Sequence, residues 1–408
     1  MERKDCFLPL YENSGQSACR MAEEIGGICR RFGKRAPGSP GERGAAEYLA
    51  AVLKNECGCG EVQTERFRVH PSSFYSYCRL SSCLDCFACL GFFIHPALSL
   101  ISGSLSMLLF LFFFVLYIPF IDPLFPERES VNVTAVRPAA GEVKRRILLN
   151  GHLDASWEFT LNYRFGGIVF EIPNIMATAC VLLYITLSVC ALCGAGPWVR
   201  QAALWGTLFL PFCVAVWFTY NPKRVVDGAN DNLSGCCMGI TLLREMERHG
   251  ISPEHTEVGV ILTGSEEAGL RGAKAWCREH REDYRDVPTF ILCFDTIHDP
   301  RFLMVNERDL NNTVAADPAL AGLFLRAAAE AGVPCRRGRV PLFGGATDSA
   351  AFVQGGFRSA GVTGLNHKLE SYYHTRKDTA ENLNREGLEN CYRALVRTLE
   401  AIDRGELD

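Results

Sequence analysis

The chain has 408 residues, of which 48% are hydrophobic and 22% are charged, and its formal net charge at pH 7 is −4. This length and apolar content are sufficient for a sizeable core, in one domain or in two. Because 42 Lys and Arg are balanced by 46 Asp and Glu, there is no basic excess, and nucleic acid is not an expected partner.

The 19 cysteines are scattered along the chain and odd in number. Many lie in apolar runs, where a cysteine behaves as a small hydrophobic residue, so we expect reduced thiols in a cytosolic setting. A thiolate metal site is an alternative at two groups, although their spacing does not repeat as in a zinc ribbon or finger. These groups are Cys57 with Cys59, and Cys78 with Cys83, Cys86 and Cys89.

The N-terminal residues lack the long apolar stretch of a signal peptide.

The first expected helix covers residues 41–54 and has Ala45 and Leu49 on one face. Ser39 stands just before it, at the position expected for an N-cap.

Two long apolar segments interrupt an otherwise water-compatible sequence. The first extends from about Leu84 to Ile121 and is nearly uncharged. A membrane-spanning helix needs roughly 20 apolar residues, so this segment fits two tight helices, the first around residues 87–101. Gly103 and the serines beside it are the expected turn, with Pro96 upstream.

The second apolar segment extends from about Asn174 to Tyr220. It divides into helices over residues 175–193 and 198–220, separated by a turn at residues 194–197. Aromatic residues near its ends are typical of a membrane interface. The alternative is a large core whose helices are hydrophobic all round, but core helices rarely run this far without a charge.

Each segment is expected to form a hairpin in the lipid bilayer, so that both of its ends return to one side. Positive residues are more frequent at these ends than at the hairpin tips, where Arg200 stands alone. The positive-inside rule then places the rest of this multi-pass membrane protein in the cytoplasm. The flanking residues are Arg79, Arg128, Arg164, Lys223 and Arg224.

Outside the apolar segments strands and helices alternate, which predicts an α/β fold. Open α/β sheets place their sites at the carboxyl ends of strands, so side chains that follow these strands are expected to meet. Strands are expected at residues 146–150, 258–263, 290–294 and 359–365. Helices are expected at residues 233–249, 269–279, 318–331 and 380–402.

Metal-ligand side chains occur where these strands end or in the loops that follow. Two histidines and three carboxylates form a ligand set for two divalent metals, and a further glutamate is a candidate base. Activation of water for hydrolysis is therefore the leading interpretation. The segments contain His152 with Asp154, Asp231, the pair Glu266 and Glu267, Asp295, and His374.

Each of these residues has a simpler interpretation when it is taken alone. The histidines resemble ordinary loop histidines, Asp231 can cap the helix that follows it, the two glutamates can form a solvated turn, and Asp295 can cap a turn. However, adjacent carboxylates at the end of an apolar strand are costly without a nearby cation. The occurrence of all five segments in this order makes the set specific.

The same segments resemble peptidase family M28, a family of zinc aminopeptidases and their relatives. Residues 228–235 (Gly-Ala-Asn-Asp-Asn-Leu-Ser-Gly) and 264–273 (Gly-Ser-Glu-Glu-Ala-Gly-Leu-Arg-Gly-Ala) are close to the family's signatures, and residues 35–49 are similar to its N-terminal segment. The similarity covers most of the chain outside the inserts. It implies a three-layer α/β fold of the zinc exopeptidase type, with a mixed sheet and flanking helices, interrupted here by two transmembrane hairpins.

The resemblance also implies a cofactor, namely two zinc ions, and a role for each of the residues above. In that scheme Asp231 bridges both ions. His152 and Asp295 complete one metal site, and Glu267 and His374 complete the other. Glu266 is the general base, and Asp154 supports His152.

Two features depart from the family pattern. A membrane insert separates His152 from Asp231, where the family usually has a short connection. Thr347-Asp348-Ser349 stands where relatives often have Ser-Asp-His, which leaves substrate recognition at that loop open.

The expected boundaries are residues 1–82, 123–173 and 221–408 for three parts of one peptidase domain, and 83–122 and 174–220 for the hairpins.

The expected function is that of a membrane-anchored dizinc metallopeptidase, with aminopeptidase activity on peptide-like substrates as the first choice. Tyr372 or Tyr373 is a candidate for a further hydrogen-bond donor at the reacting carbonyl. Three alternatives stay open: a dizinc carboxypeptidase or dipeptidase of the M20 type, a glutaminyl-cyclase-like acyltransferase with one zinc, and a non-catalytic membrane scaffold with a peptidase-like domain.

Overall fold

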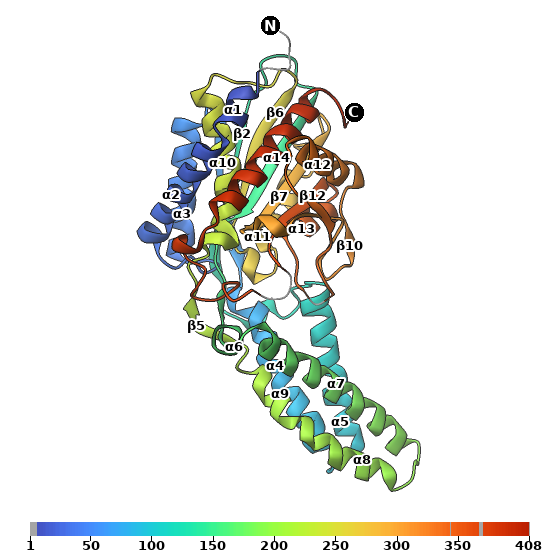
Figure 1. Ribbon diagram of the computed structural model, residues 1–408. Helices are drawn as coiled ribbons and strands as arrows, with labels where there is room; N and C mark the ends of the chain where they lie inside the picture. Colours follow the sequence, from blue (N-terminus) through green and yellow to red (C-terminus); the bar gives the residue numbers. More distant parts are fainter. Residues whose placement is uncertain (1–5, 343, 367–369, 408) are drawn as a thin grey trace.

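The computed structural model describes residues 6–342, 344–366 and 370–407. An eight-stranded mixed sheet forms its centre, in the order β1-β2-β6-β3-β7-β12-β8-β11 (Figure 1). Strands β6, β3, β7 and β12 run parallel to one another, so their carboxyl ends lie at the same edge. The strands are β1 (Glu61–Val69), β2 (Arg128–Arg137), β3 (Arg145–His152), β6 (Thr256–Thr263), β7 (Thr289–Ile297), β8 (Leu303–Asn306), β11 (Arg336–Gly338) and β12 (Arg358–Gly364).

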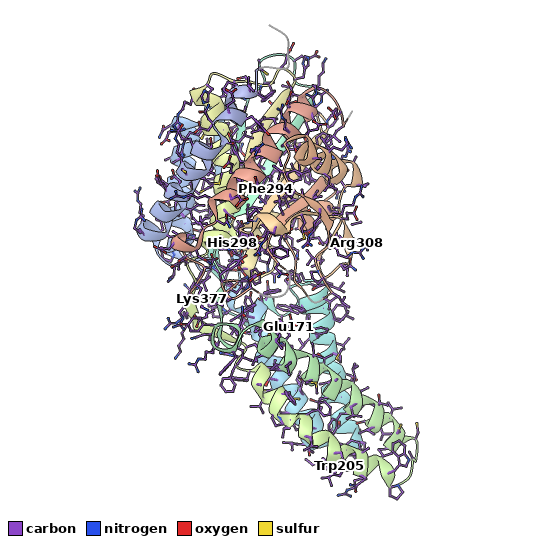
Figure 2. The ribbon with its side chains drawn as sticks, viewed as in Figure 1. Glu171, Trp205, Phe294, His298, Arg308 and Lys377 are labelled. Carbon is purple, nitrogen blue, oxygen red and sulfur yellow. The ribbon has the colours of Figure 1, made fainter. Side chains whose placement is uncertain are left out.

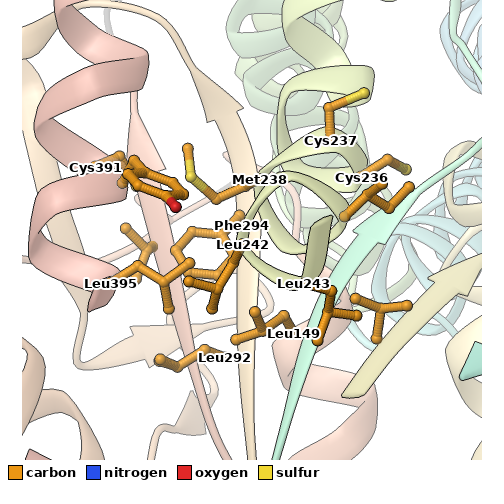
Figure 3. Packing of buried hydrophobic residues seen from close by; sticks show 14 of the residues in the cluster. Leu149, Cys236, Cys237, Met238, Leu242, Leu243, Leu292, Phe294, Cys391 and Leu395 are labelled. Carbon is orange, nitrogen blue, oxygen red and sulfur yellow. The ribbon is translucent and has the colours of Figure 1, made fainter. Parts of the chain in front are cut away.

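Helices cover both faces of this sheet, which confirms the three-layer α/β fold. Alternate residues of a strand point to opposite faces, so Ile147 and Leu149 enter one core and Leu148 enters the other. Figure 3 shows part of the first core, where Met238 and Leu242 lie near Phe294. Residues of α1 (Leu8–Glu12), α2 (Ser14–Phe32), α3 (Pro40–Glu56), α10 (Ser234–Arg248), α12 (Pro318–Glu330) and α14 (Arg385–Asp403) join the first core, and residues of α11 (Arg271–His280) and α13 (Asp348–Gln354) join the second.

Most of the expected elements of the sheet and its helices are present, with boundaries shifted by a few residues. The Ser39 hydroxyl accepts a hydrogen bond from the Glu42 amide, which confirms the expected N-cap of α3. Helix α14 begins at Arg385 rather than at residue 380, because residues 380–382 form a separate 3-10 turn. Helix α2 and strands β1 and β2 had not been anticipated. The residues of β1 other than Val69 are exposed or partly exposed, as in an edge strand, so its sequence lacks a strong apolar signal.

The two apolar segments form a helical bundle that projects from one end of the domain (Figure 1). Three helical segments of the described chain are long and apolar enough to cross a membrane: Pro96–Val115, Gly167–Leu192 and Trp198–Val216. The bundle consists of α4 (Pro71–Gly91), α5 (Pro96–Leu109) with the π-helix Phe110–Val115, α7 (Gly167–Leu192), α8 (Trp198–Gly206) and α9 (Leu210–Val216). Figure 2 places Glu171 where α7 meets the domain and Trp205 near the far end of the bundle.

The first hairpin turns earlier than expected. Its turn lies at residues 92–95, and the prediction of a turn at Gly103 is wrong, as is the helix expected over residues 87–101. Pro96 is a helix-starting residue, and the His95 side chain caps the new helix by accepting a hydrogen bond from the Ala97 amide at 3.2 Å. Gly103 instead lies within α5, where an added Cβ would come 3.0 Å from Ile185 of α7, so it permits close helix packing.

The second hairpin has the expected turn between α7 and α8, and its two ends are held together by a small sheet. Strand β4 (Trp157–Phe159) pairs antiparallel with β5 (Tyr220–Val225), and Phe159 is the partner of Tyr220. The short helix α6 (Thr160–Phe165) follows β4. This pairing brings His152 and Asp231 to the same place although the insert separates them in sequence. A second small sheet pairs β9 (Arg308–Asp309) with β10 (Val314–Ala315).

Large exposed hydrophobic side chains are concentrated on the bundle. Among the described residues, all of them except Leu8 and Leu342 lie between residues 80 and 218. Ile101 of α5 and Trp205 of α8, for example, are 66% and 65% exposed. The surface of the bundle is therefore apolar, whereas that of the domain is not.

Candidate metal centre

The side chains expected to bind metal meet at the carboxyl edge of the parallel strands. His152 is the last residue of β3, and Asp295 lies near the end of β7. Glu266 and Glu267 begin a 3-10 turn after β6, because Ser265 adopts a left-handed backbone conformation that redirects the chain. Asp231 lies in the turn before α10. His374 lies in the loop between β12 and α14.

Asp231 lies between the two histidines. Its Oδ1 is 3.1 Å from His152 Nε2, and its Oδ2 is 3.0 Å from His374 Nε2. The ligand atoms of His152, Asp231 and Asp295 all lie within 4.8 Å of one another, and so do those of Asp231, Glu267 and His374. The centre therefore contains two groups of three ligands that share Asp231.

The two neighbouring glutamates differ in what they contact. Glu267 Oε1 is 3.1 Å from His374 Nε2, whereas Glu266 Oε2 is 3.8 Å from His152 Nε2. The ligand atoms of His152, Glu266 and Glu267 also lie within 4.8 Å of one another. Distance alone therefore does not assign one glutamate to the metal and the other to proton transfer.

A carboxylate behind the centre orients both glutamates. The two oxygens of Asp154 accept hydrogen bonds from the backbone amides of Glu266 and Glu267, each at 3.0 Å, and Asp154 Oδ1 is 3.4 Å from His152 Nδ1. Asp154 thus ties the end of β3 to the turn after β6. This arrangement extends the support of His152 that the sequence suggested.

Two further carboxylates support the centre, and neither was singled out from the sequence. Asp378 accepts hydrogen bonds from the amides of Asn230 and Asp231 at 2.8 and 3.2 Å. Glu42 accepts one from the Ser265 amide at 2.7 Å, and burial together with the charge of Asp154 raises the pKa of Glu42 to about 8. Glu42 lies far from the ligands in sequence, whereas Asp378 stands only four residues after His374 but carries no sequence signal of its contact with the Asn230 and Asp231 amides.

The electrostatics of the centre are those of a buried, strongly negative cluster. Burial and the neighbouring Asp231 raise the pKa of Asp295 to about 7. Burial also raises the pKa of Glu266 well above its usual value; His152 opposes this and Glu267 adds to it. Burial favours neutral His374, but Glu267 and Asp231 outweigh it and raise the pKa of His374 to about 10. So many buried carboxylates require compensating positive charge.

The residues fit a pair of zinc ions. Glu267 Oε1 is buried and has no hydrogen-bond donor among the described residues, although it lies near His374 Nε2. An acceptor of this kind, in a set of two imidazoles and three carboxylates, suits a metal ion with nitrogen and oxygen ligands.

The bundle contributes a side chain to the centre. The Tyr75 hydroxyl, from α4, donates to Glu267 Oε2 at 3.2 Å and lies 3.2 Å from Ser156 Oγ. Ser156 Oγ in turn lies 2.9 Å from His374 Nδ1, so it fixes the orientation of that ring. Tyr75 precedes the first apolar segment, and nothing in its sequence context signalled this contact.

The structure places the two candidate donors, Tyr372 and Tyr373, and the loop around Thr347 in different surroundings. Tyr373 lines the cavity and stacks on the His374 ring, with centroids 4.1 Å apart, whereas Tyr372 packs against the His298 ring. The Thr347 hydroxyl donates to Asp309 at 2.6 Å. Asp348 accepts a hydrogen bond from Thr263, so it ties this loop to β6.

The larger of the two suggested thiolate groups is not among the metal-ligand clusters of the described residues. Cys89 lies instead with Cys180 and Cys213, inside the bundle, and its sulfur is 3.4 Å from that of Cys180. The described residues contain no disulfide.

A cavity of about 610 Å³ lies between the metal centre and the bundle. At one end it is lined by metal-centre residues such as Asp231, Glu267 and His374. At the other end it is lined by residues of the bundle such as Phe110 and Val181. The centre is therefore reached through space that both parts of the molecule enclose.

Known structures with the same fold are zinc-dependent exopeptidases and glutaminyl cyclases. The zinc aminopeptidase BSAP of Bacillus subtilis has a TM-score of 0.55 at 12% identity, over 94% of each chain. A Zn-dependent exopeptidase of Parabacteroides distasonis has a TM-score of 0.53 at 13% identity, over 97% of this chain and 98% of that one. The glutaminyl cyclase of Fimbriiglobus ruber has a TM-score of 0.57 at 14% identity, over 94% of each chain. The fold is thus that of the zinc exopeptidases.

The sequence comparison agrees with this fold. Residues 215–399 match the sequence model of peptidase family M28. The match contains four of the five expected ligands, whereas His152 lies outside it, before the second insert. A search of curated proteins by sequence found no match.

Proposed function

We propose that the chain is a membrane-anchored dizinc peptidase that hydrolyses peptide-like amides, with aminopeptidase activity as the first choice. The observation that carries the proposal is the position of Asp231, whose two oxygens each face one histidine of a separate three-ligand group. A carboxylate shared in this way is suited to bridge two cations. The M28 match supports the same chemistry.

Each group would hold one zinc ion. His152, Asp231 and Asp295 would hold the first, and Asp231, Glu267 and His374 would hold the second. When bound, a zinc pair lowers the pKa of a water molecule toward about 7 and polarises the substrate carbonyl.

Glu266 is the proposed general base. It accepts the proton of the attacking water and passes it to the leaving amine. The same carboxyl group can take both roles, because the proton that it accepts as a base is the one that it returns as an acid. Asp154 is a positioning residue, since it holds the backbone amides of both glutamates. The Tyr75 hydroxyl donates to Glu267, and Tyr373 lines the cavity beside His374.

The lining of the cavity weighs against a carboxypeptidase or dipeptidase of the M20 type. Such enzymes act on substrates with a free carboxylate, which needs a cationic partner. Among the described residues that line the cavity, none is Lys or Arg. A neutral or positively charged substrate matches this lining better.

We further propose that the bundle spans the membrane and that the peptidase domain faces the cytoplasm. The three apolar helices and the exposed hydrophobic surface support the first part. The positive residues at the domain end, including exposed Arg164, Lys223 and Arg224, support the second.

A metal count combined with an activity assay tests the enzymatic proposal. The protein, purified with zinc supplied, should contain two zinc ions per chain and release amine from leucine p-nitroanilide. Loss of ammonia from glutaminyl peptides without amide hydrolysis would indicate the glutaminyl-cyclase alternative. Metal at background level with no turnover would indicate the scaffold.

Thiol labelling in sealed cells tests the orientation. Single-cysteine versions that keep Cys6, in the domain, or Cys193, in the turn between α7 and α8, place one exposed thiol at each end of the molecule. An impermeant maleimide should label Cys193 from outside and Cys6 only after permeabilisation. The reverse result would contradict the cytoplasmic placement.

A further inference from the structure

The cavity beside the metal centre extends far into the bundle. Phe159 contacts the His374 ring, with centroids 4.5 Å apart, and stacks on Phe170 of α7 at 4.6 Å. Thr178 also lines the cavity and lies eight residues further along α7, which corresponds to about 12 Å. The cavity is therefore deeper than a single amino-acid side chain requires.

Three helices of the bundle enclose this extension. Ser81 of α4, Met107 of α5 and Val181 of α7 all line it. Most of the lining there is apolar or aromatic. Of the polar side chains, Asp85 and Ser106 are hydrogen-bonded to each other at 2.5 Å, whereas the Ser81 hydroxyl is buried without a partner among the described residues. Such a lining favours an apolar chain, because burial removes that chain from water.

The charge of the lining restricts the other end of the ligand. The acidic residues there are Asp85, Glu171 and those of the metal centre, and His374 is the one imidazole among the described lining residues. A carboxylate on the ligand would meet like charge. A neutral amide or an amine would not.

We propose that the substrate is an amide that carries one long apolar chain and no carboxylate. The amide lies at the metal centre, and the chain lies between α4, α5 and α7. This inference rests on the proposed hydrolase function and names the substrate class. The chain can be an alkyl tail, as in an amino lipid, or a run of apolar side chains, as in a hydrophobic peptide.

Two substrate series, assayed with the protein reconstituted into nanodiscs, distinguish an alkyl tail from a run of apolar side chains. The first contains leucine amides of ethylamine, hexylamine and decylamine. The second contains leucine peptides with one to four further leucines and an amidated C-terminus. In at least one series kcat/KM should rise by roughly twofold to fourfold per added methylene, or its equivalent in apolar surface, until the cavity is filled. A response to the alkyl series alone indicates an amino lipid, and a response to the peptide series alone indicates a hydrophobic peptide.

A carboxylate beside the amide tests the second half of the proposal. The leucine amide of 2-aminoundecanoic acid has the same ten-carbon chain as the decylamide but carries a carboxylate next to the scissile amide. Its kcat/KM should be at least tenfold lower than that of the decylamide. Equal values would contradict the exclusion of carboxylates.

A matched pair of substitutions locates the chain. Thr178 and Thr186 both lie on α7, and each hydroxyl bonds the carbonyl four residues earlier at 2.8 Å, but Thr186 is exposed and lies outside the cavity lining. Thr178→Phe should lower the ratio of decylamide to ethylamide kcat/KM at least tenfold. Thr186→Phe should leave that ratio unchanged.

The outcomes distinguish this inference from the proposed function. Hydrolysis of all amides with no dependence on chain length, in wild type and in both variants, overturns the inference and leaves the hydrolase intact. Absence of hydrolysis of every amide by zinc-loaded protein overturns both.

Discussion

The peptidase domain and the helical bundle distribute their polar side chains in opposite ways. The domain gathers carboxylates and histidines in its interior, where His152 and Asp231 are 2% and 3% exposed. The bundle keeps few charges and presents large apolar side chains outward, such as Ile101. One region is therefore suited to water and the other to lipid, and the cavity lies where the two meet. The contrast places the candidate metal centre beside a cavity that a polar domain and an apolar bundle enclose together.

The largest effect is expected when Asp231, the ligand shared by both groups in the domain, is removed. Asp231→Ala should lower bound zinc from two ions per chain to fewer than one and reduce turnover to background, because both ligand groups lose a member. Elemental analysis and an aminoacyl-amide assay measure this. Thermal unfolding of the variant checks that the fold persists, and retention of two zinc ions would contradict the bridging role.

The next effect concerns proton transfer without loss of metal. Glu266→Gln should keep both zinc ions but lower kcat by about 10²–10⁴-fold, since a carboxamide cannot accept a proton at neutral pH. Glu267→Gln serves as the comparison, because removing a ligand charge should also reduce zinc content. Near wild-type turnover in zinc-loaded Glu266→Gln protein would assign the base elsewhere.

A smaller effect tests the lipid-facing surface of the bundle. Leu105 of α5 is 47% exposed near the middle of an apolar span, and an arginine there should disfavour insertion by about 3 kcal/mol. Leu105→Arg should lower the fraction of protein that resists carbonate extraction. Leu8→Arg, at an exposed apolar position of the domain, is the control and should not change that fraction. If both variants remained fully integrated, the α5 surface would not face lipid.

The smallest effect concerns the contact between the two regions. Tyr75→Phe removes the hydroxyl that donates to Glu267, and loss of one such bond costs about 0.5–1.5 kcal/mol. We expect kcat/KM to fall about twofold to tenfold with zinc content unchanged. Tyr184→Phe also removes a buried hydroxyl bond, to the Ala203 carbonyl, but far from the centre, so it should not alter kcat/KM. Equal losses in both variants would mean a general effect on the bundle.

The sequence was informative about the domain because its ligands follow apolar strands. His152, Asp231, the two glutamates and the other ligands meet as the motifs predicted, since parallel strands bring their carboxyl ends to one edge. The supporting groups Glu42 and Tyr75 were not predictable, because each reaches the centre from a distant part of the chain. Asp378 stands four residues after His374, but nothing in the sequence signals its contact with the amides of Asn230 and Asp231.

The sequence was less informative about the bundle, because its long apolar runs show no periodic pattern that would mark where a helix begins or ends. The turn of the second hairpin, rich in glycine and proline, was found correctly. The turn of the first was misplaced at Gly103, because a glycine that permits close helix packing has the same sequence signal as one that permits a turn. In such a segment Pro96, at a helix start, was the better guide.

The order of the strands has a consequence for how the protein is made. Strand β3 lies between β6 and β7, yet it is synthesised before the second hairpin, whereas its two neighbours are synthesised after it. His152 must therefore wait for its partner ligands until both hairpins have left the ribosome. The candidate metal centre therefore cannot assemble until the second apolar hairpin has been synthesised, although its first ligand is made before that hairpin.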